Sequence, residues 1–242
     1  MSPLLYDELV PWYRLLDPPA DHADEVASYV DALCRTIHGE AHTLLELGSG
    51  AGHNAVHLKH RFEVTLSDMA PAMLALSREL HPECDHHLAD MRTLRLGRLF
   101  DAVLVHDAIM YMTTEDDLSA VIATAAAHLR PGGAAVFAPD CTRDNFREHT
   151  DLIEEAAGDR ALRCLAWAWD PDPHDSTFVT EYAFLLRDGV TVQAVHDRHL
   201  EGLFSQATWL RLLDGGGFDV TLFERPLDEE GAFDQVFVGR RR

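Results

Sequence analysis

The chain has 242 residues, of which 47% are hydrophobic and 25% charged, and its formal net charge is −21. A surface this acidic repels nucleic acid and anionic lipid, so we expect neither nucleic acid nor a membrane as a partner. No apolar run approaches the ~20 residues needed to cross a bilayer, and the N-terminus lacks the basic start and apolar core of a signal peptide, so we expect a cytoplasmic protein.

Up to Asp140, short apolar runs alternate with helical patterns, which is typical of a parallel sheet covered by helices. The predicted strands are 42–47, 62–68, 85–90, 100–107 and 134–140. The predicted helices are 53–60, 70–80 and a segment that Thr113 or Thr114 caps and that runs to about His128. The segment "RPGG" (130–133) is expected to turn into the fifth strand.

After the fifth strand the pattern changes. Residues 141–175 contain helix-like pieces, whereas 176–200 alternate and turn at Asp188-Gly189, a strong hairpin signal. We therefore interpret 141–201 as an insertion that forms a lid or substrate cap.

The C-terminal part returns to the first pattern. Ser205 is expected to cap a helix, and the runs 218–225 and 233–240 predict two further strands. The expected organisation is one domain over residues 1–242.

The stretch "LLELGSGAGHNA" (44–55) places glycines at 48, 50 and 52 where a buried strand ends. Glycine costs backbone entropy on folding, so this backbone must turn sharply or approach a ligand closely. In open α/β sheets, ligands bind beyond the carboxyl ends of the strands, near the first strand. Asp68 ends the second strand about 20 residues after Gly48, where a carboxylate can accept the hydroxyls of a ribose.

Polar residues also end the next two strands. Asp90 ends the third, where its carboxylate or the neighbouring backbone can bind an adenine amino group, and His106 and Asp107 end the fourth. Because parallel strands end at one edge of a sheet, these residues predict a single nucleoside site.

The sequence resembles the class I S-adenosylmethionine-dependent methyltransferases over nearly its whole length. The matching segments are "ELGSGAG" (46–52), "LSDMAPAML" (66–74), "LADM" (88–91), "FDAVLVHDAIMYM" (100–112) and "LRPGGAAVF" (129–137). The resemblance implies S-adenosylmethionine as cofactor and an α/β fold: a doubly wound, Rossmann-like, seven-stranded sheet with an antiparallel last strand and an inserted β-hairpin. The cofactor-binding residues it implies are Glu46, Gly48, Ser49, Gly50, Gly52, Asp68, Met69, Asp90, Met91, His106 and Asp107.

Rival functions fit less well. A nicotinamide dehydrogenase needs G-x-G-x-x-G, and the third glycine position is occupied here by His53. A nucleic-acid methyltransferase is expected to carry a D/N-P-P-Y-like base pocket after the fourth strand, which "HDAIMY" lacks. No pair of acidic ligands follows the fifth strand as in metal-dependent catechol enzymes, so no metal is expected.

Methyl transfer from an activated cofactor depends mainly on alignment, with a base where the acceptor must lose a proton. The candidate catalytic residues are His106, His196, His199 and Tyr6. Histidine suits a base because its ordinary pKa of about 6.5 lies near working pH. Strand alternation places His196 and His199 on opposite faces, of which only one can look into the cleft. In similar enzymes, a segment such as the one that begins at Tyr6 folds over the cofactor.

The acceptor is expected near the ends of the fourth and fifth strands, beside Asp107, Tyr111 and Asp140. "HDRHLEGLF" (196–204) and "GGGF" (215–218) are similar to aminosugar N,N-dimethyltransferases of natural-product pathways, and more loosely to glycine N-methyltransferase-like enzymes. We expect N- or O-methylation of a small-molecule acceptor in secondary metabolism. A non-catalytic cofactor-binding member of the same fold is the alternative, and a homodimer is an open expectation.

Overall fold

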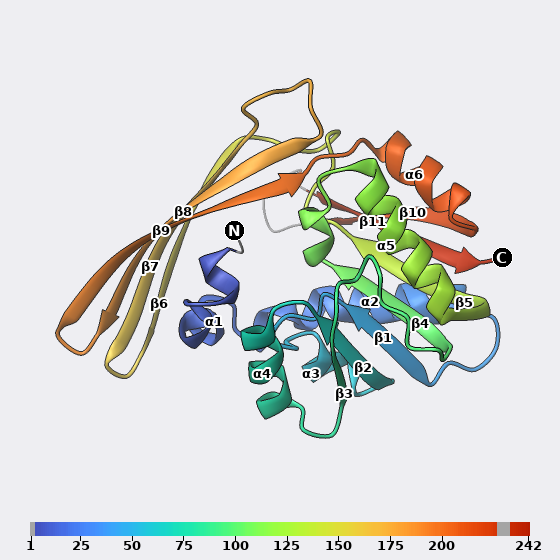
Figure 1. The fold of residues 1–242 in the computed structure, drawn as a ribbon, viewed down its shortest axis with the longest axis horizontal. Helices are drawn as coiled ribbons and strands as arrows, with labels where there is room; N and C mark the ends of the chain where they lie inside the picture. The colour runs from blue at the N-terminus through green and yellow to red at the C-terminus, as the bar shows by residue number, and fades with distance from the viewer. Residues whose placement is uncertain (1–2, 227–232) are drawn as a thin grey trace.

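The computed structural model describes residues 3–226 and 233–242, which form two sheets (Figure 1). The larger sheet has seven strands in the order β10-β11-β5-β4-β1-β2-β3. Their bounds are β1 Thr43–Leu47, β2 Glu63–Asp68, β3 Asp85–Leu88, β4 Phe100–His106, β5 Leu129–Ala138, β10 Phe218–Pro226 and β11 Phe233–Arg241. Strand β11 runs antiparallel to both of its neighbours, whereas β1 to β5 are parallel. The predicted doubly wound, Rossmann-like class with an antiparallel last strand is confirmed.

Helices cover both faces of this sheet, which explains why its central strands are mainly apolar on both faces, with Glu46 in β1 and Asp101 in β4 as exceptions. One face packs against α2 (Ala23–Thr36) and the single turn α3 (Ala55–Leu58), and the other against α5 (Glu115–His128) and α6 (Gln206–Gly215). Helix α4 (Pro71–Leu80) packs on β2 and β3. The sheet is therefore a rigid platform whose strand ends hold side chains in fixed places.

Two predicted helix caps are confirmed. The Thr114 side chain accepts a hydrogen bond from the Asp117 backbone N–H at the start of α5, and Ser205 accepts one from Thr208 N–H at the start of α6. Each cap satisfies a backbone donor that has no partner within the helix.

Several predicted bounds were wrong. The helix predicted for 53–60 has only one turn, and β3 ends at Leu88, so Asp90 lies in the loop that follows. The "RPGG" segment belongs to β5, where the register with β4 shifts between Phe100 and Ala102. A shift of this kind accommodates extra residues without a turn.

Residues 141–201 contain the second sheet, which projects to one side (Figure 1). Its order is β6-β7-β8-β9, and it is antiparallel throughout. The bounds are β6 His149–Ala157, β7 Arg160–Trp169, β8 Thr177–Asp188 and β9 Thr191–Gly202.

The hairpin at Asp188-Gly189 is confirmed, but the helical pieces predicted between 141 and 175 are strands. In β7, buried Cys164 alternates with the more exposed Arg163 and Leu165. Alanine and leucine, which favour helices, obscured this two-residue period, and pairing with β8 overrides that preference.

The N-terminal segment lies against the inner face of the second sheet. It contains the short helices η1 (Leu4–Tyr6) and α1 (Val10–Leu16), and η2 (Pro19–His22) then leads into α2. Leu5 and Leu9 share an apolar cluster with β7 and β8. The Leu5 N–H also donates to Asp197 Oδ2 on β9 at 2.9 Å. The segment is thus fastened to the second sheet by apolar and polar contacts.

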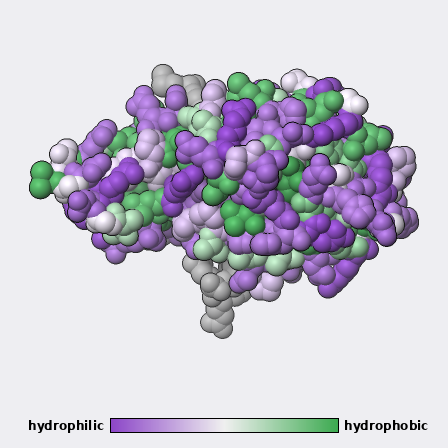
Figure 2. Space-filling view, turned by 90° about the horizontal axis from the view of Figure 1, so that it is seen from below, coloured by the Kyte–Doolittle hydropathy of each residue, from purple (hydrophilic) through white to green (hydrophobic). Residues whose placement is uncertain are grey.

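The surface seen in Figure 2 is mainly hydrophilic, with hydrophobic side chains in small scattered groups, as the acidic composition leads one to expect. Among the helices of residues 3–226 and 233–242, none is both long and apolar enough to cross a membrane. All four cysteines are free; Cys164 is buried and Cys34 exposed.

Candidate active site

A cavity of about 480 Å³ lies at the carboxyl ends of the parallel strands, between them and the N-terminal segment. This volume suits a ligand of cofactor size. The structure brings most of the predicted cofactor residues to its wall: Gly48, Ser49, Gly50, Asp68, Met69, Asp90, Met91, His106 and Asp107.

The glycine loop needs left-handed backbone at alternate positions. Gly48 has φ +75° and Gly52 φ +79°, conformations that side chains disfavour. A Cβ at Gly48 would collide with Ala108, and one at Gly52 would lie 2.6 Å from Ser77 Oγ. Gly52 therefore packs the loop against α4 and does not line the cavity, which corrects its predicted role as a direct cofactor contact.

The Asp68 carboxylate is held beside the same loop. Its Oδ2 accepts from the Gly50 N–H at 2.8 Å and its Oδ1 from the Ala70 N–H at 2.7 Å. Burial raises its pKa, against the effect of these backbone bonds. A carboxylate has about four acceptor positions, so positions remain for two hydroxyl groups of a ligand.

The Asp90 carboxylate forms an ion pair with an arginine. Arg92 Nε lies 3.1 and 3.0 Å from the two Asp90 oxygens, and Arg92 Nη2 lies 2.6 Å from Oδ2. Arg92 also binds Asp117 at 2.7 Å. Two groups were predicted to bind an adenine here, the Asp90 carboxylate and the neighbouring backbone. The carboxylate is engaged by Arg92, so the backbone is the group that remains available.

Glu46 lies behind the loop and outside the cavity wall. Its Oε1 accepts from Asn54 Nδ2 at 2.9 Å, and burial raises its pKa to about 7. Glu46 therefore supports the loop through Asn54 and does not line the cavity.

His106 has no free ring nitrogen. Its Nδ1 lies 3.1 Å from Asn54 Nδ2, and its Nε2 lies 2.6 Å from Asp107 Oδ1 and 3.5 Å from Glu25 Oε1. Burial lowers its pKa, but the Asp107 and Glu25 carboxylates outweigh this and hold the pKa well above its ordinary value. A histidine held in this way is poorly suited to act as a base, which argues against His106 as the group that takes the acceptor proton.

Asp107 turns the chain out of β4 into the short helix η3 (Ala108–Tyr111). Its φ of 35° is the one left-handed value at a non-glycine residue within 3–226 and 233–242. Such strain persists where the surroundings enforce it and is often found at functional sites. Its carboxylate, 53% exposed, lies with Asp140 on a side pocket of about 160 Å³. We use the name acceptor chamber for the part of the cavity at Tyr6, Asp107 and Tyr111 together with this side pocket, which Asp107 also lines and which contains Asp140.

The structure joins two of the predicted catalytic residues and excludes a third. Tyr6 Oη lies 2.8 Å from Tyr111 Oη, which lies 2.7 Å from His199 Nδ1. His199 Nε2 in turn lies 3.1 Å from Asp197 Oδ2. His196 points to the opposite face of β9, as the alternation predicts, where its 67% exposed side chain pairs with Glu181. It does not reach the site.

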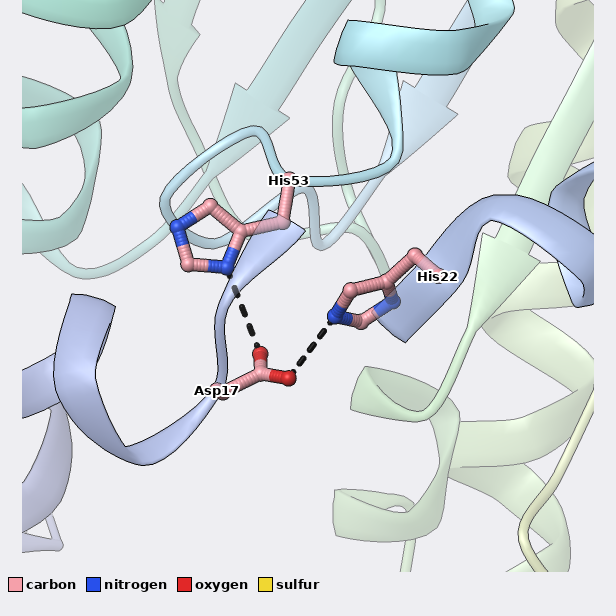
Figure 3. Close-up of side chains that lie close together, drawn as sticks. All are labelled: Asp17, His22 and His53. Atoms are coloured by element: carbon pink, nitrogen blue, oxygen red, sulfur yellow. Dashed lines mark hydrogen bonds and ion pairs between the residues drawn. The ribbon is translucent and has the colours of Figure 1, made fainter. Parts of the chain in front are cut away.

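Sequence reasoning missed a cluster of charged side chains on the cavity wall. The Asp17 carboxylate lies between His22 and His53, 2.7 Å from His22 Nε2 and 3.4 Å from His53 Nδ1 (Figure 3). His22 Nδ1 lies 2.9 Å from Glu25 Oε1. Burial opposes its charge, but its bonds to the two carboxylates raise the pKa of His22 to about 10. These residues come from separate loops and a helix, so no local motif could have revealed them.

Two overlapping sets in this region have ligand atoms close enough to hold a metal ion: Asp17 with His22 and His53, and His22 with Glu25 and His106. The sequence predicted no metal. Asp17 and Glu25 already contact histidine nitrogens and form an ion network within the protein, whereas His53 Nε2 is buried with no hydrogen-bond partner among the described residues.

Known proteins share this architecture. A family model described as "Methyltransferase domain" matches residues 44–133. The chain is 30% identical to the dTDP-3-amino-3,4,6-trideoxy-alpha-D-glucopyranose N,N-dimethyltransferase of Streptomyces venezuelae, over 88% of this chain and 90% of that protein.

Solved structures agree with this likeness. The crystal structure of DesVI from Streptomyces venezuelae has a TM-score of 0.84 at 26% identity, with 97% of this chain and 98% of that one covered. The S-adenosylmethionine-bound amino pentose methyltransferase CalS10 from Micromonospora echinaspora has a TM-score of 0.80 at 26% identity, with 91% of each chain covered.

Asp68→Ala should weaken binding of S-adenosylhomocysteine at least about tenfold, because a charge-assisted contact contributes roughly 1.5–3 kcal/mol. Titration calorimetry measures this, with Asp151→Ala on the exposed strand β6 as the control. Unchanged affinity in a folded Asp68→Ala protein would remove Asp68 from the cofactor site.

His22→Gln should destabilise the fold more at pH 6 than at pH 10.5. The pKa of His22 is about 10 in the folded protein and about 6.5 when unfolded, so its contribution is complete below pH 6.5 and is lost as pH rises through 10. Chemical denaturation at pH 6 should show a loss of about 1.5–3 kcal/mol. Exposed His60→Gln is the control, and an equal loss at both pH values would contradict the ion network.

Proposed function

The chain belongs to the class I S-adenosylmethionine-dependent methyltransferases, and we propose that the atom it methylates is an amino nitrogen. It is an enzyme that acts on a small molecule, with S-adenosylmethionine as its cofactor. The observation that carries the proposal is the set of acidic side chains in and beside the acceptor chamber: Asp107, Asp140 and Glu201.

The described residues fit the cofactor. When bound, it supplies a methyl group already activated on a sulfonium. The Gly48–Ala51 backbone would cradle it, because Gly50 faces the cavity and a Cβ there would approach only Met73, at 3.4 Å. Asp68 would bind the ribose hydroxyls, and Met69 with the backbone of 89–91 would enclose the adenine.

The amino-acid end of the cofactor would then lie beside Asp17 and Asn54, which also line the cavity. Asp17, whose pKa is lowered, offers a carboxylate for an ammonium group. This placement leaves the acceptor chamber for the second substrate.

The acidic groups of the acceptor chamber disfavour one another's charge. The pKa of Asp140 lies well above its usual range because of the enclosing walls and the neighbouring Asp107. Burial, together with Asp107, raises the pKa of Glu201 to about 6, although Glu201 accepts from Thr180 Oγ1 at 2.5 Å. An ammonium group between them would relieve this repulsion, so the chamber favours a cationic acceptor.

The charges that line the site also bear on whether the amine acceptor is attached to a diphosphate. The similar N,N-dimethyltransferase of Streptomyces venezuelae is named for a dTDP-linked aminosugar, which bears a diphosphate. Of the described residues that line the cavity and its side pocket, the arginines are Arg92 and Arg225. Arg92 is bound by Asp90 and Asp117, and Arg225 contacts Glu25 and Asp234. We therefore propose a free amine or aminosugar as the preferred acceptor.

We further propose that the insertion 141–201 is the substrate cap. Its inner face carries His199 and Glu201, whose contacts lie next to Tyr6. Acceptor specificity would then reside in the second sheet, whereas the glycine loop and β2 serve the cofactor.

Purified enzyme should methylate free aminosugars on nitrogen and should use their dTDP-linked forms at least about tenfold less well. Mass spectrometry of the products and release of S-adenosylhomocysteine measure this. Methylation of a hydroxyl oxygen would contradict the amine proposal, and equal use of both forms would contradict the proposed carrier.

Glu201→Gln should lower kcat/KM for the amine about 10–100-fold, because a charge-assisted bond to the ammonium is lost. Affinity for S-adenosylhomocysteine should not change. Glu181→Gln is the matched control, since Glu181 pairs with His196 and Arg198 on the outer face. A Glu201 variant as active as the parent would remove this residue from acceptor binding.

A homodimer also remains a proposal, and the outer face of the second sheet would form it. Leu152 and Leu165 pair across β6 and β7 and are 67% and 45% exposed, and Leu185 is 52% exposed. Exposed apolar groups of this kind are suited to a self-complementary contact. Analytical ultracentrifugation should find a dimer that Leu165→Arg dissociates, and a monomeric parent protein would contradict the proposal.

A further inference from the structure

We infer that Tyr6, Tyr111 and His199 form a proton relay that removes a proton from the acceptor ammonium, and that Asp197 is the positioning residue of this relay. The inference rests on the proposed amine acceptor. It assigns the role of base to His199 instead of His106. His199 is connected to the acceptor chamber through the hydroxyl groups of Tyr111 and Tyr6.

The hydrogen bonds of this chain can all point one way. Asp197 is ionised and can only accept, so the proton of His199 lies on Nε2, 3.1 Å from Asp197 Oδ2. His199 Nδ1 is then an acceptor, and the Tyr111 hydroxyl donates to it over 2.7 Å. The Tyr6 hydroxyl donates to Tyr111 Oη over 2.8 Å. Tyr6 Oη keeps an acceptor position for an acceptor N–H, and Tyr6 lines the cavity.

The electrostatic surroundings suit each member to its part. Burial lowers the pKa of His199, with Asp197 opposing, so His199 is neutral near neutral pH and its Nδ1 can accept a hydrogen bond. Bonds from Leu5 N–H and His199 lower the pKa of Asp197 despite burial, so it stays ionised.

The tyrosines transmit protons but do not hold a negative charge. Burial raises the pKa of Tyr6 and that of Tyr111 well above the ordinary value. The other titratable groups facing His199 are Tyr182, whose ring centre lies 4.7 Å away, and Glu201 on the same face of β9. Burial also raises the pKa of Tyr182.

The proton movement balances without another reagent. The ammonium N–H bond breaks, its electron pair stays on nitrogen, and its proton passes to Tyr6 Oη. At the same time the Tyr6 proton passes to Tyr111, and the Tyr111 proton to His199 Nδ1. The resulting imidazolium faces Asp197, as a histidine base faces its aspartate in a catalytic triad. The nitrogen is left with the lone pair that methyl transfer needs.

Asp197 also links the relay to the N-terminal segment. The same Oδ2 that contacts His199 accepts from the Leu5 N–H at 2.9 Å, and Tyr6 is the next residue. The relay is therefore complete only when this segment lies against the second sheet. Proton removal would then occur only in a covered site.

The first test is the pH dependence of methylation by His199→Gln and Tyr111→Phe. At pH 7, kcat/KM for the amine should fall about 100-fold, the lower range of what a positioned base contributes. Above the pKa of the acceptor amine, activity should return towards that of the parent, because the free base needs no relay. Asp197→Asn should give the same pH signature, with partial recovery in Asp197→Glu.

The matched control is His196→Gln, three residues away on the outer face of the same strand, which should match the parent at every pH. Affinity for S-adenosylhomocysteine should survive in all variants. A deficit of equal size at every pH would make these residues merely structural and would overturn the relay, as would full activity of His199→Gln at pH 7. If no amine is methylated by the parent enzyme at any pH, the proposed function fails instead.

A second test needs no turnover. Imidazole nitrogen NMR of the S-adenosylhomocysteine complex at pH 7 should show His199 neutral, with its proton on Nε2 and with Nδ1 accepting a hydrogen bond. Tyr111→Phe, which removes the donor to Nδ1, should shift the Nδ1 resonance, and comparison with His199→Gln assigns the signal. A proton on Nδ1, or a charged His199 at pH 7, would overturn the relay.

Discussion

The alternating contact of histidines and carboxylates along the cavity wall is the interaction on which the site depends. It runs from His53 through Asp17, His22, Glu25 and His106 to Asp107. These six residues come from the glycine loop, the N-terminal region, α2 and the end of β4. Each contact pairs a histidine nitrogen with a carboxylate in partly buried surroundings. Removing one partner of such a pair destabilises the protein, because the other charge is left buried without a partner. The network therefore holds together segments that are distant in sequence.

Charged groups are arranged in opposite ways in two neighbouring parts of the site, which meet at Asp107. Beside Asp17, histidines offset the carboxylates, and the pKa of Asp17 is lowered despite its burial. In the acceptor chamber, Asp140 and Glu201 have no such partners in the described contacts beyond Thr180, and the pKa of each is raised. The first arrangement stabilises the protein, whereas the second stores repulsion that a cationic ligand can relieve. Desolvation acts to raise the pKa of all three carboxylates, so the direction of the net pKa shift, and not burial, distinguishes Asp17 from Asp140 and Glu201.

Local patterns in the sequence predicted which residues meet at one cavity wall. Gly48, Asp68 and Asp107 lie at the ends of buried strands, and parallel strands carry such residues to one edge without further information. The same logic could not predict roles that depend on neighbours from elsewhere in the chain. His106 lies at the end of its strand as predicted. Its Nε2, however, contacts Glu25 from α2, a neighbour that the local sequence could not indicate.

The second sheet was harder to predict because its pattern is weak. The alternation in β9 predicted that His196 and His199 face opposite ways, but which face is inner depends on the packing of Leu5 against β7 and β8. Strand β6 is exposed on both faces over most of its length, so it carries no apolar period to detect. Pairing with β7, rather than its own sequence, makes it a strand.

That exposed strand has a consequence for the behaviour of the protein in concentrated solution. Strand β6 pairs only with β7 among the described strands, so its other side offers backbone groups to any extended peptide. Such an edge invites strand-by-strand aggregation unless something discourages it. Asp151, Glu154 and Glu155 place negative charge along it, and a second acidic chain approaching this edge would be repelled. The negative charge of the chain thus opposes aggregation through this edge strand.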